Sequence, residues 1–204
     1  MINPRRTLCI SLFAGTMAGP VSAQSGERPD PTIRSGTTVA ISDHVYVILD
    51  NGVSMVPNVG IVVGDRGTLV IDTGLGEANG RIVLAEATGV ARSDRLYVAA
   101  THAHPEHDLG ASAFPAEATL IRSRDQQADV DEFGMGLANR FATFSARHSQ
   151  LLEGAEIRVA DVVFDNELVI DLGGGDSACT RGGPNAHERR HDLPRRGGRH
   201  SVLG

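Results

Sequence analysis

Two short apolar runs joined by a tight turn constrain the fold of this chain more than any other feature. Gly60 to Val63 and Thr68 to Asp72 flank the turn GDRG, and such a pair predicts a β-hairpin. A helical segment is expected from about Glu77 to Gly89, and a further strand from about Arg95 to Ala100. Because strands and helices alternate, the pattern predicts the α/β class.

The same pattern continues on both sides of this region. A strand is expected before the hairpin, from Val39 to Asp50, because its β-branched residues nearly alternate with polar ones. The later segments are a short apolar run at Ala118 to Ile121, a helical stretch near Gln126 to Ala146, and two final runs at Ala155 to Phe164 and Glu167 to Leu172.

Composition excludes several classes of protein. With 204 residues and 41% hydrophobic residues, the chain suits one soluble domain. Its net charge of −6 argues against a general nucleic-acid binder, which needs a basic face for phosphate contacts. Two cysteines are too few for a disulfide scaffold.

The N-terminus has the pattern of a secretory signal peptide. Residues 1–23 combine two early arginines, a short apolar run and the small-residue cleavage site Val21-Ser22-Ala23. The alternative, a transmembrane anchor, needs about 20 apolar residues, and this run is shorter. We therefore expect an exported protein, periplasmic or secreted, with no membrane attachment after cleavage. Residues 24–37 are expected to be a flexible lead-in.

Four potential metal ligands lie within the segment THAHPEHDLG, directly after an expected apolar strand: His102, His104, Glu106 and His107. Open α/β layers place ligand sites at the C-terminal ends of strands. In an extended stretch, His102 and His104 project to the same side, and Pro105 disfavours a helical conformation at His104. A bend after Pro105 would bring Glu106 and His107 to a second point close by.

Imidazole and carboxylate groups suit zinc, and a catalytic zinc keeps one coordination position open for water. Such a water loses its proton near pH ~7 and provides a hydroxide nucleophile. The alternative is a polar surface loop that is rich in histidine. The number of ligands in this short segment favours the metal site.

The segments NVGIVVGDRGTLVIDTG and THAHPEHDLGASAF resemble the metallo-β-lactamase fold superfamily of metal-dependent hydrolases, over about Asp43 to Gly174. The family pattern is an Asp after the second core strand, followed by H-x-H-x-D-H. The resemblance implies that His102 and His104 bind a first metal, and that His107 and the residue at position 106 bind a second. It also implies that Asp72 orients the metal loop, whereas on its own Asp72 could simply cap a strand-end turn.

One residue departs from the family motif. Glu106 stands where the family usually has Asp, and its extra methylene moves the carboxylate by about one carbon–carbon bond. That shift is large against metal-site tolerances of about 0.2 Å. The sequence therefore leaves open whether one or two zinc ions bind. Glu106 and Asp72 are the candidate catalytic residues beside the histidines.

The resemblance implies an αββα sandwich built of two similar halves. After a stretch like ELVIDLGG the family has a segment H-T-x-G-D, which supplies a third histidine and a bridging Asp. This chain instead continues GGDSACTRGGPNAHERRHDLPRRGGRHSVLG. We therefore expect residues 38–174 to form the N-terminal half of such a domain, with the sandwich truncated after it.

The genetic code offers a reason for the different C-terminal segment. Codons compatible with residues 184–204, read from the second base of each, can encode THTSGDTTFLVEEGVTLFSG. That string contains H-T-x-G-D and an apolar strand, so we expect residues 175–204 to be an out-of-frame, disordered tail. The alternatives are a basic tail that binds anionic partners, or His187, His191 and His200 as real ligands.

Together these features predict a zinc-dependent hydrolase. A metal-activated hydroxide would attack a carbonyl-type, small-molecule substrate such as a β-lactam, a thioester or another ester. The alternative is an inactive or merely metal-binding remnant of such an enzyme, with an apolar sheet face left exposed. Neither the substrate nor the oligomeric state follows from the sequence.

Overall fold

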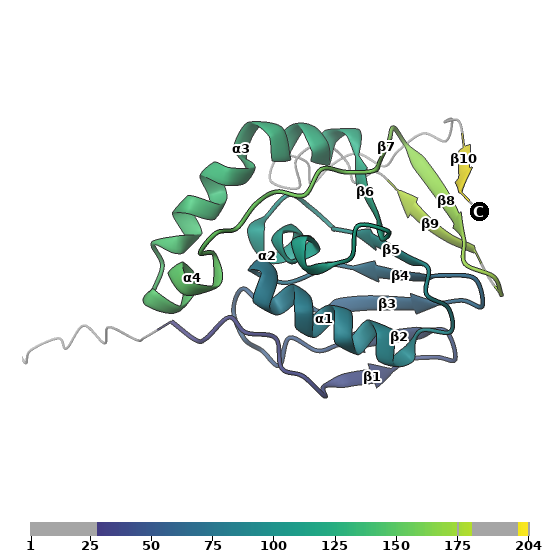
Figure 1. The fold of residues 1–204 in the computed structure, drawn as a ribbon, viewed down its shortest axis with the longest axis horizontal. Coiled ribbons are helices and arrows are strands. Elements are labelled where there is room, and N and C mark those ends of the chain that lie inside the picture. The colour runs from purple at the N-terminus through teal and green to yellow at the C-terminus, as the bar shows by residue number, and fades with distance from the viewer. Residues whose placement is uncertain (1–27, 175, 181–199, 204) are drawn as a thin grey trace, which may run out of the picture.

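The computed structural model describes residues 28–174, 176–180 and 200–203 (Figure 1). The expected signal peptide at 1–23, the start of the lead-in and most of the tail lie outside the described residues. In the described part of the chain, no helix is long and apolar enough to cross a membrane.

The described strands form two sheets. The larger has seven strands in the order β1-β2-β3-β4-β5-β6-β7, and the smaller has three in the order β10-β8-β9. In the larger sheet β1 to β4 are antiparallel neighbours, whereas β4 to β7 run parallel. The strands are β1 (Thr38–Ala40), β2 (Val45–Ile48), β3 (Val59–Val63), β4 (Thr68–Ile71), β5 (Leu96–Ala99), β6 (Thr119–Ser123), β7 (Val162–Phe164), β8 (Glu167–Asp171), β9 (Asp176–Thr180) and β10 (His200–Leu203).

The helices are α1 (Gly76–Val90), α2 (Pro105–Asp108), α3 (Arg124–Ala142) and α4 (Ala146–Leu151), with a 3₁₀ helix η1 (Leu109–Ala113) after α2. The hairpin β3–β4, helix α1 and strand β5 confirm the predictions made for these segments. The long helix expected near 126–146 is instead two helices. The chain turns after Ala142, and the hydroxyl of Ser145 accepts a hydrogen bond from His148 N at 3.3 Å, which begins α4 as an N-cap.

The single strand expected from Val39 to Asp50 is a hairpin of β1 and β2. The chain reverses at residues 41–44, where the backbone N–H groups of Ile41 and Ser42 both donate to Val45 O, at 2.8 and 3.1 Å. The alternation of side chains continues through both strands, so the pattern did not reveal the reversal. Likewise, only Val162–Phe164 of the run at 155–164 pairs as a strand.

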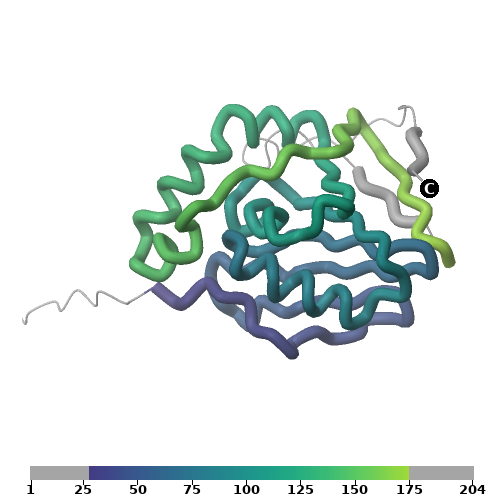
Figure 2. The backbone as a smooth tube through the Cα atoms, viewed as in Figure 1, coloured from purple at the N-terminus to yellow at the C-terminus, as the bar shows by residue number. Residues whose placement is uncertain are grey.

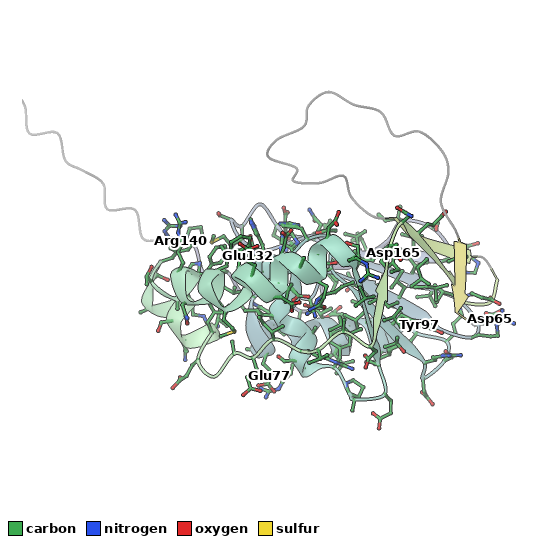
Figure 3. The ribbon with its side chains drawn as sticks, turned by 90° about the horizontal axis from the view of Figure 1, so that it is seen from above. Asp65, Glu77, Tyr97, Glu132, Arg140 and Asp165 are labelled. Carbon is green, nitrogen blue, oxygen red and sulfur yellow. The ribbon has the colours of Figure 1, made fainter. Side chains whose placement is uncertain are left out.

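Side chains from the two faces of the larger sheet enter different apolar clusters. Ile61 of β3 and Val70 of β4 pack with Val83 of α1 on one face. Leu69 and Tyr97, which point the opposite way, pack with Leu168, Ile170 and Leu172 of and after β8. Figure 3 shows Tyr97 and Asp65 at the end of the molecule that carries the smaller sheet, with Arg140 of α3 at the other end. The described residues therefore form helix, sheet and sheet layers, which confirms the α/β class.

The described part of the lead-in is held in place, in contrast to the flexible segment expected at 24–37. Ile33 is buried, and its N–H donates to the side-chain oxygen of Asn79 in α1 at 2.8 Å, while the Asn79 amide donates to Pro31 O at 3.0 Å. Glu86 of α1 accepts hydrogen bonds from Ser35, Gly36 and Thr38. Figure 2 shows this N-terminal segment passing beside α4 and the start of α1. Polar side chains of α1 therefore order this part of the lead-in, and the local sequence of the lead-in did not indicate these contacts.

Two pieces of the expected tail lie in strands, where we expected no regular structure. The backbone of β9 pairs antiparallel and that of β10 pairs parallel with β8. Without these neighbours, both edges of β8 would present backbone N–H and C=O groups, and a segment of almost any sequence can pair with such groups. His187 and His191 lie outside the described residues. The division of the chain at residue 174 and the altered reading frame stay predictions.

Candidate metal centre

The histidine segment and Asp72 meet at one edge of the larger sheet. Asp72 follows β4 and the segment from Thr101 follows β5, and these two strands are parallel neighbours. The C-terminal ends of adjacent parallel strands lie side by side, which is where open α/β sheets place ligand sites. The N–H of Asp72 donates to Ala99 O at 2.8 Å, so the two strand ends are joined directly.

The histidine segment bends as it leaves β5 and then enters α2. His104 has an extended backbone (φ −79°, ψ 147°) and Pro105 begins the helix, a position where proline is favoured because the first helical N–H has no partner in the helix. The turn brings three imidazole rings together. The centroid of the His102 ring lies 4.6 Å from that of His104 and 4.0 Å from that of His107.

Asp72 is buried and connects β4 to this cluster. Its Oδ2 lies 2.9 Å from His107 Nδ1, and its Oδ1 accepts from the backbone N–H of Thr101 at 2.7 Å. Its φ of 69° lies in the left-handed region, which non-glycine residues adopt only where surrounding contacts hold them. An Nδ1–H bond to a carboxylate fixes the orientation of the His107 ring and directs its Nε2 outward.

The sequence did not indicate the role of Thr101. Its hydroxyl contacts both oxygens of Asp72, at 3.0 and 3.1 Å, and lies 3.1 Å from His102 Nδ1 and 3.3 Å from His107 Nδ1. Thr101 therefore joins the carboxylate to two of the three rings. Its place immediately before the histidine motif was the only local signal.

The surroundings of His102 favour its neutral form. Burial first, and then the neighbouring rings of His107 and His104, lower the pKa of His102 to about 4, against the opposing effect of Asp72. A neutral imidazole keeps a lone pair on one ring nitrogen near neutral pH. That lone pair is what a metal ion needs from a histidine ligand.

Glu106 turns inward from α2. The residue is 9% exposed, and its Oε1 lies 3.8 Å from His104 Nδ1. Its Oε2 is buried and has no hydrogen-bond partner among the described residues. The same is true of Nε2 of the buried His148 in α4, whose pKa is lowered by burial and then by Arg28, while the Glu106 carboxylate acts in the opposite direction. His148 is a second residue near the cluster that the sequence did not single out.

The donor types at this edge fit zinc, because neutral imidazole nitrogens and a carboxylate oxygen without a partner are its usual ligands. Among the described residues, however, no three His, Cys, Asp or Glu side chains are arranged so that they already form a site for one ion. The structure thus brings together His102, His104, His107 and Asp72, with Glu106 beside them. In this arrangement the ring of His102 lies against the rings of His104 and His107.

Comparisons with known proteins place this geometry in context. Residues 54–187, more than half of the chain, match the family model described as the Metallo-beta-lactamase superfamily. This match continues past residue 174 into the segment expected to be out of frame. Comparison with curated proteins finds no match.

Several solved structures are similar to this chain. The native FEZ-1 metallo-beta-lactamase from Legionella gormanii is 19% identical with a TM-score of 0.52, covering 72% of this chain and 53% of that one. GOB-18 from Elizabethkingia meningoseptica is 20% identical with a TM-score of 0.48, covering 72% and 51%. The HARLDQ-motif metallo-beta-lactamase from Cronobacter sakazakii is 23% identical with a TM-score of 0.40, covering 50% and 39%. At these identities the likeness to FEZ-1 supports the fold alone, and this chain spans about half the length of that structure.

Proposed function

Because this chain belongs to the metallo-beta-lactamase superfamily, we propose that it is a zinc-dependent hydrolase that acts on a carbonyl-type small molecule. Membership supports a metal-dependent hydrolase; zinc and the substrate class of β-lactam, thioester or other ester are the proposal. The observation that carries it is the convergence of three imidazole rings and Asp72 at the C-terminal ends of β4 and β5.

Each residue of the cluster has a separate part in this proposal. His102, His104 and His107 would hold the metal, and the low pKa of His102 keeps its ring neutral for that purpose. Asp72 would orient His107 through the 2.9 Å contact to Nδ1, and Thr101 holds Asp72 in place. Zinc, when bound, makes a hydroxide nucleophile accessible near neutral pH and polarises a carbonyl oxygen.

Glu106 is the candidate carboxylate ligand for a second ion. Its buried Oε2 is without a partner in the described part of the chain, and a buried carboxylate oxygen without a partner is costly unless a ligand or proton satisfies it. The longer side chain places this oxygen differently from an aspartate. One tightly bound zinc and one weakly bound zinc are the arrangement that we propose.

A second candidate is a metal-binding remnant without catalytic activity. It is favoured by the absence, among the described residues, of three His, Cys, Asp or Glu side chains that are already arranged to hold one ion. The two candidates differ in whether hydrolysis accompanies metal binding.

The test compares the 204-residue chain with a chain restored to the alternative reading frame after residue 174. Zinc content is measured after dialysis, and turnover is measured with a chromogenic β-lactam and with a thioester. We expect zinc and turnover in the restored chain and little of either in the 204-residue chain. Zinc without turnover in both chains would favour the remnant, and absence of zinc from both would reject the proposal.

Ligand assignment is tested by His102→Ala in the restored chain, which should lose its tightly bound zinc. His44→Ala is the matched control, since His44 lies before β2, near Val63 and at the opposite end of the sheet, and should leave zinc content unchanged. Retention of stoichiometric zinc by His102→Ala would count against the assignment. Sequencing the gene across residue 174 decides the reading frame, and sequencing the N-terminus of the mature protein tests the proposed export through a start at Gln24.

A further inference from the structure

A buried ion pair lies directly beside the histidine cluster. Arg122 Nη2 donates to Asp108 Oδ2 at 2.7 Å, and Arg122 Nε donates to Asp108 Oδ1 at 3.3 Å. The Arg122 side chain is 0% exposed and that of Asp108 is 4% exposed. Two parallel bonds between a planar guanidinium and a carboxylate fix both the separation and the relative orientation of the two groups.

The guanidinium is held independently of Asp108. Its Nη1 donates to Arg158 O at 2.8 Å, in the segment before β7, and to Gln127 Oε1 at 3.3 Å, in the first turn of α3. All three nitrogens of the group therefore have partners, as a buried charge requires. Arg122 itself lies in β6, so the charge is anchored to the larger sheet.

Asp108 connects Arg122 to the helix α2, which also contains Glu106 and His107. It is the last residue of α2 and directly follows His107. On the other side, the His107 ring contacts Asp72, and the His107 carbonyl accepts from Thr73 N at 2.9 Å. The short helix is thus attached to the end of β4 through His107 and to β6 through Asp108.

We propose that Arg122 is a positioning residue for the metal ligands, acting through Asp108; the inference rests on the proposed function for its link to zinc. The side-chain hydrogen bonds of Arg122 go to Asp108, Gln127 and Arg158 O, and none of them goes to His102, His104 or His107. Without the Arg122–Asp108 pair, hydrogen bonds at His107 and Gly110 would still hold this segment to the residues after β4, but α2 could rotate away from β6. Rotation would move Glu106 and His107 relative to His102, whereas ligand geometry must hold to about 0.2 Å.

The experiment uses the full chain and two readouts. Backbone hydrogen exchange of residues 101–110 is measured in the 204-residue chain stripped of metal by a chelator, and zinc affinity is measured in the frame-restored chain by competition with a chromogenic chelator. The variants are Arg122→Lys, Arg122→Met and the double variant Arg122→Met/Asp108→Leu. The double variant leaves no unpaired buried charge, so it keeps the test valid if Arg122→Met fails to fold. The control is Arg124→Met. Arg124 lies two residues after Arg122, and this substitution removes its exposed ion pair with Asp165.

We expect exchange in 101–110 to become several-fold faster in the folded double variant, with the other segments unchanged. Zinc affinity should fall about 10–100-fold, as for other groups that support metal ligands. The exchange rate and zinc affinity of Arg122→Lys should lie between those of the double variant and those of the chain without these substitutions. Both values should be unchanged in Arg124→Met.

Wild-type exchange at 101–110 in the folded double variant, or acceleration spread evenly over the whole chain, would overturn the positioning role. If the frame-restored chain without these substitutions binds no zinc, the proposed function is rejected, while the exchange measurement on the 204-residue chain still decides whether Arg122 holds the loop.

Discussion

Gly110, two residues after Asp108, lies where two backbone segments come unusually close. A Cβ added to Gly110 would lie 2.0 Å from Thr73 O, 2.7 Å from Thr73 C and 3.0 Å from Gly74 O. The approach is also bonded, since Gly110 N donates to Gly74 O at 3.0 Å. Thr73 directly follows Asp72, so Gly110→Ala would strain the edge of the sheet that carries the metal cluster.

The size of the effect follows from this geometry. Non-bonded heavy atoms settle near 3.5 Å, so the two segments would have to separate by about 1.5 Å. The obstructing atoms belong to the backbone and cannot rotate away as a side chain can. Overpacking of this kind typically costs 1–3 kcal/mol, and we expect about 3 kcal/mol here. For a chain of this length that corresponds to a fall in Tm of roughly 6–12 °C.

The matched control is Gly136→Ala. Gly136 lies in α3, is exposed, and a Cβ added there would meet nothing within 4 Å. Alanine is favoured over glycine inside a helix by about 0.8–1 kcal/mol, so this variant should unfold at a slightly higher temperature. Both are measured by thermal unfolding followed by circular dichroism. A Tm for Gly110→Ala equal to or above that of the unchanged chain would refute the argument from close packing.

Two further predictions concern carboxylates. The pKa of Glu86 is lowered by hydrogen bonds, first from the Thr38 hydroxyl and then from the Gly36 N–H and the Ser35 hydroxyl. A carboxylate whose pKa is lowered in the folded state contributes stability above its unfolded-state pKa, and this stability is lost as the pH falls through its folded-state pKa. Glu86→Gln should therefore reduce Tm near pH 7, with the difference from the unchanged chain shrinking toward pH 3 in a pH series; a constant difference would contradict this origin. Glu106→Asp in the frame-restored chain should raise the zinc content that remains after dialysis, measured by elemental analysis, and unchanged zinc content would remove Glu106 from the second site.

Most of the regular structure near the candidate site follows from local patterns. The hairpin at 59–71, helix α1 and strand β5 are all where the alternation and spacing of apolar residues placed them. The predictions failed where a reversal did not interrupt the pattern, as between β1 and β2, and where polar contacts from a distant element decided the outcome. Ile33 and Pro31 are held by Asn79, which lies 46 residues beyond Ile33 in the chain.

The candidate site divides in the same way. Its ligands were visible in the sequence because His102, His104, Glu106 and His107 lie close together along the chain. The contacts that hold them were not visible, because Arg122 lies 14 residues from Asp108, and Arg158 O lies 36 residues from Arg122. An arginine after an apolar run is more often exposed than buried.

The sequence by itself determined which chemical groups are available and the strand from whose end they come, since both depend on residues that are near neighbours in the chain. Only the tertiary structure decided how these groups are oriented. The adjacency of the parallel strands β4 and β5 places the Asp72 carboxylate against His107, and the burial of Arg122 fastens α2 from the other side. Orientation depends on contacts between distant segments, and these exist only once the chain has folded.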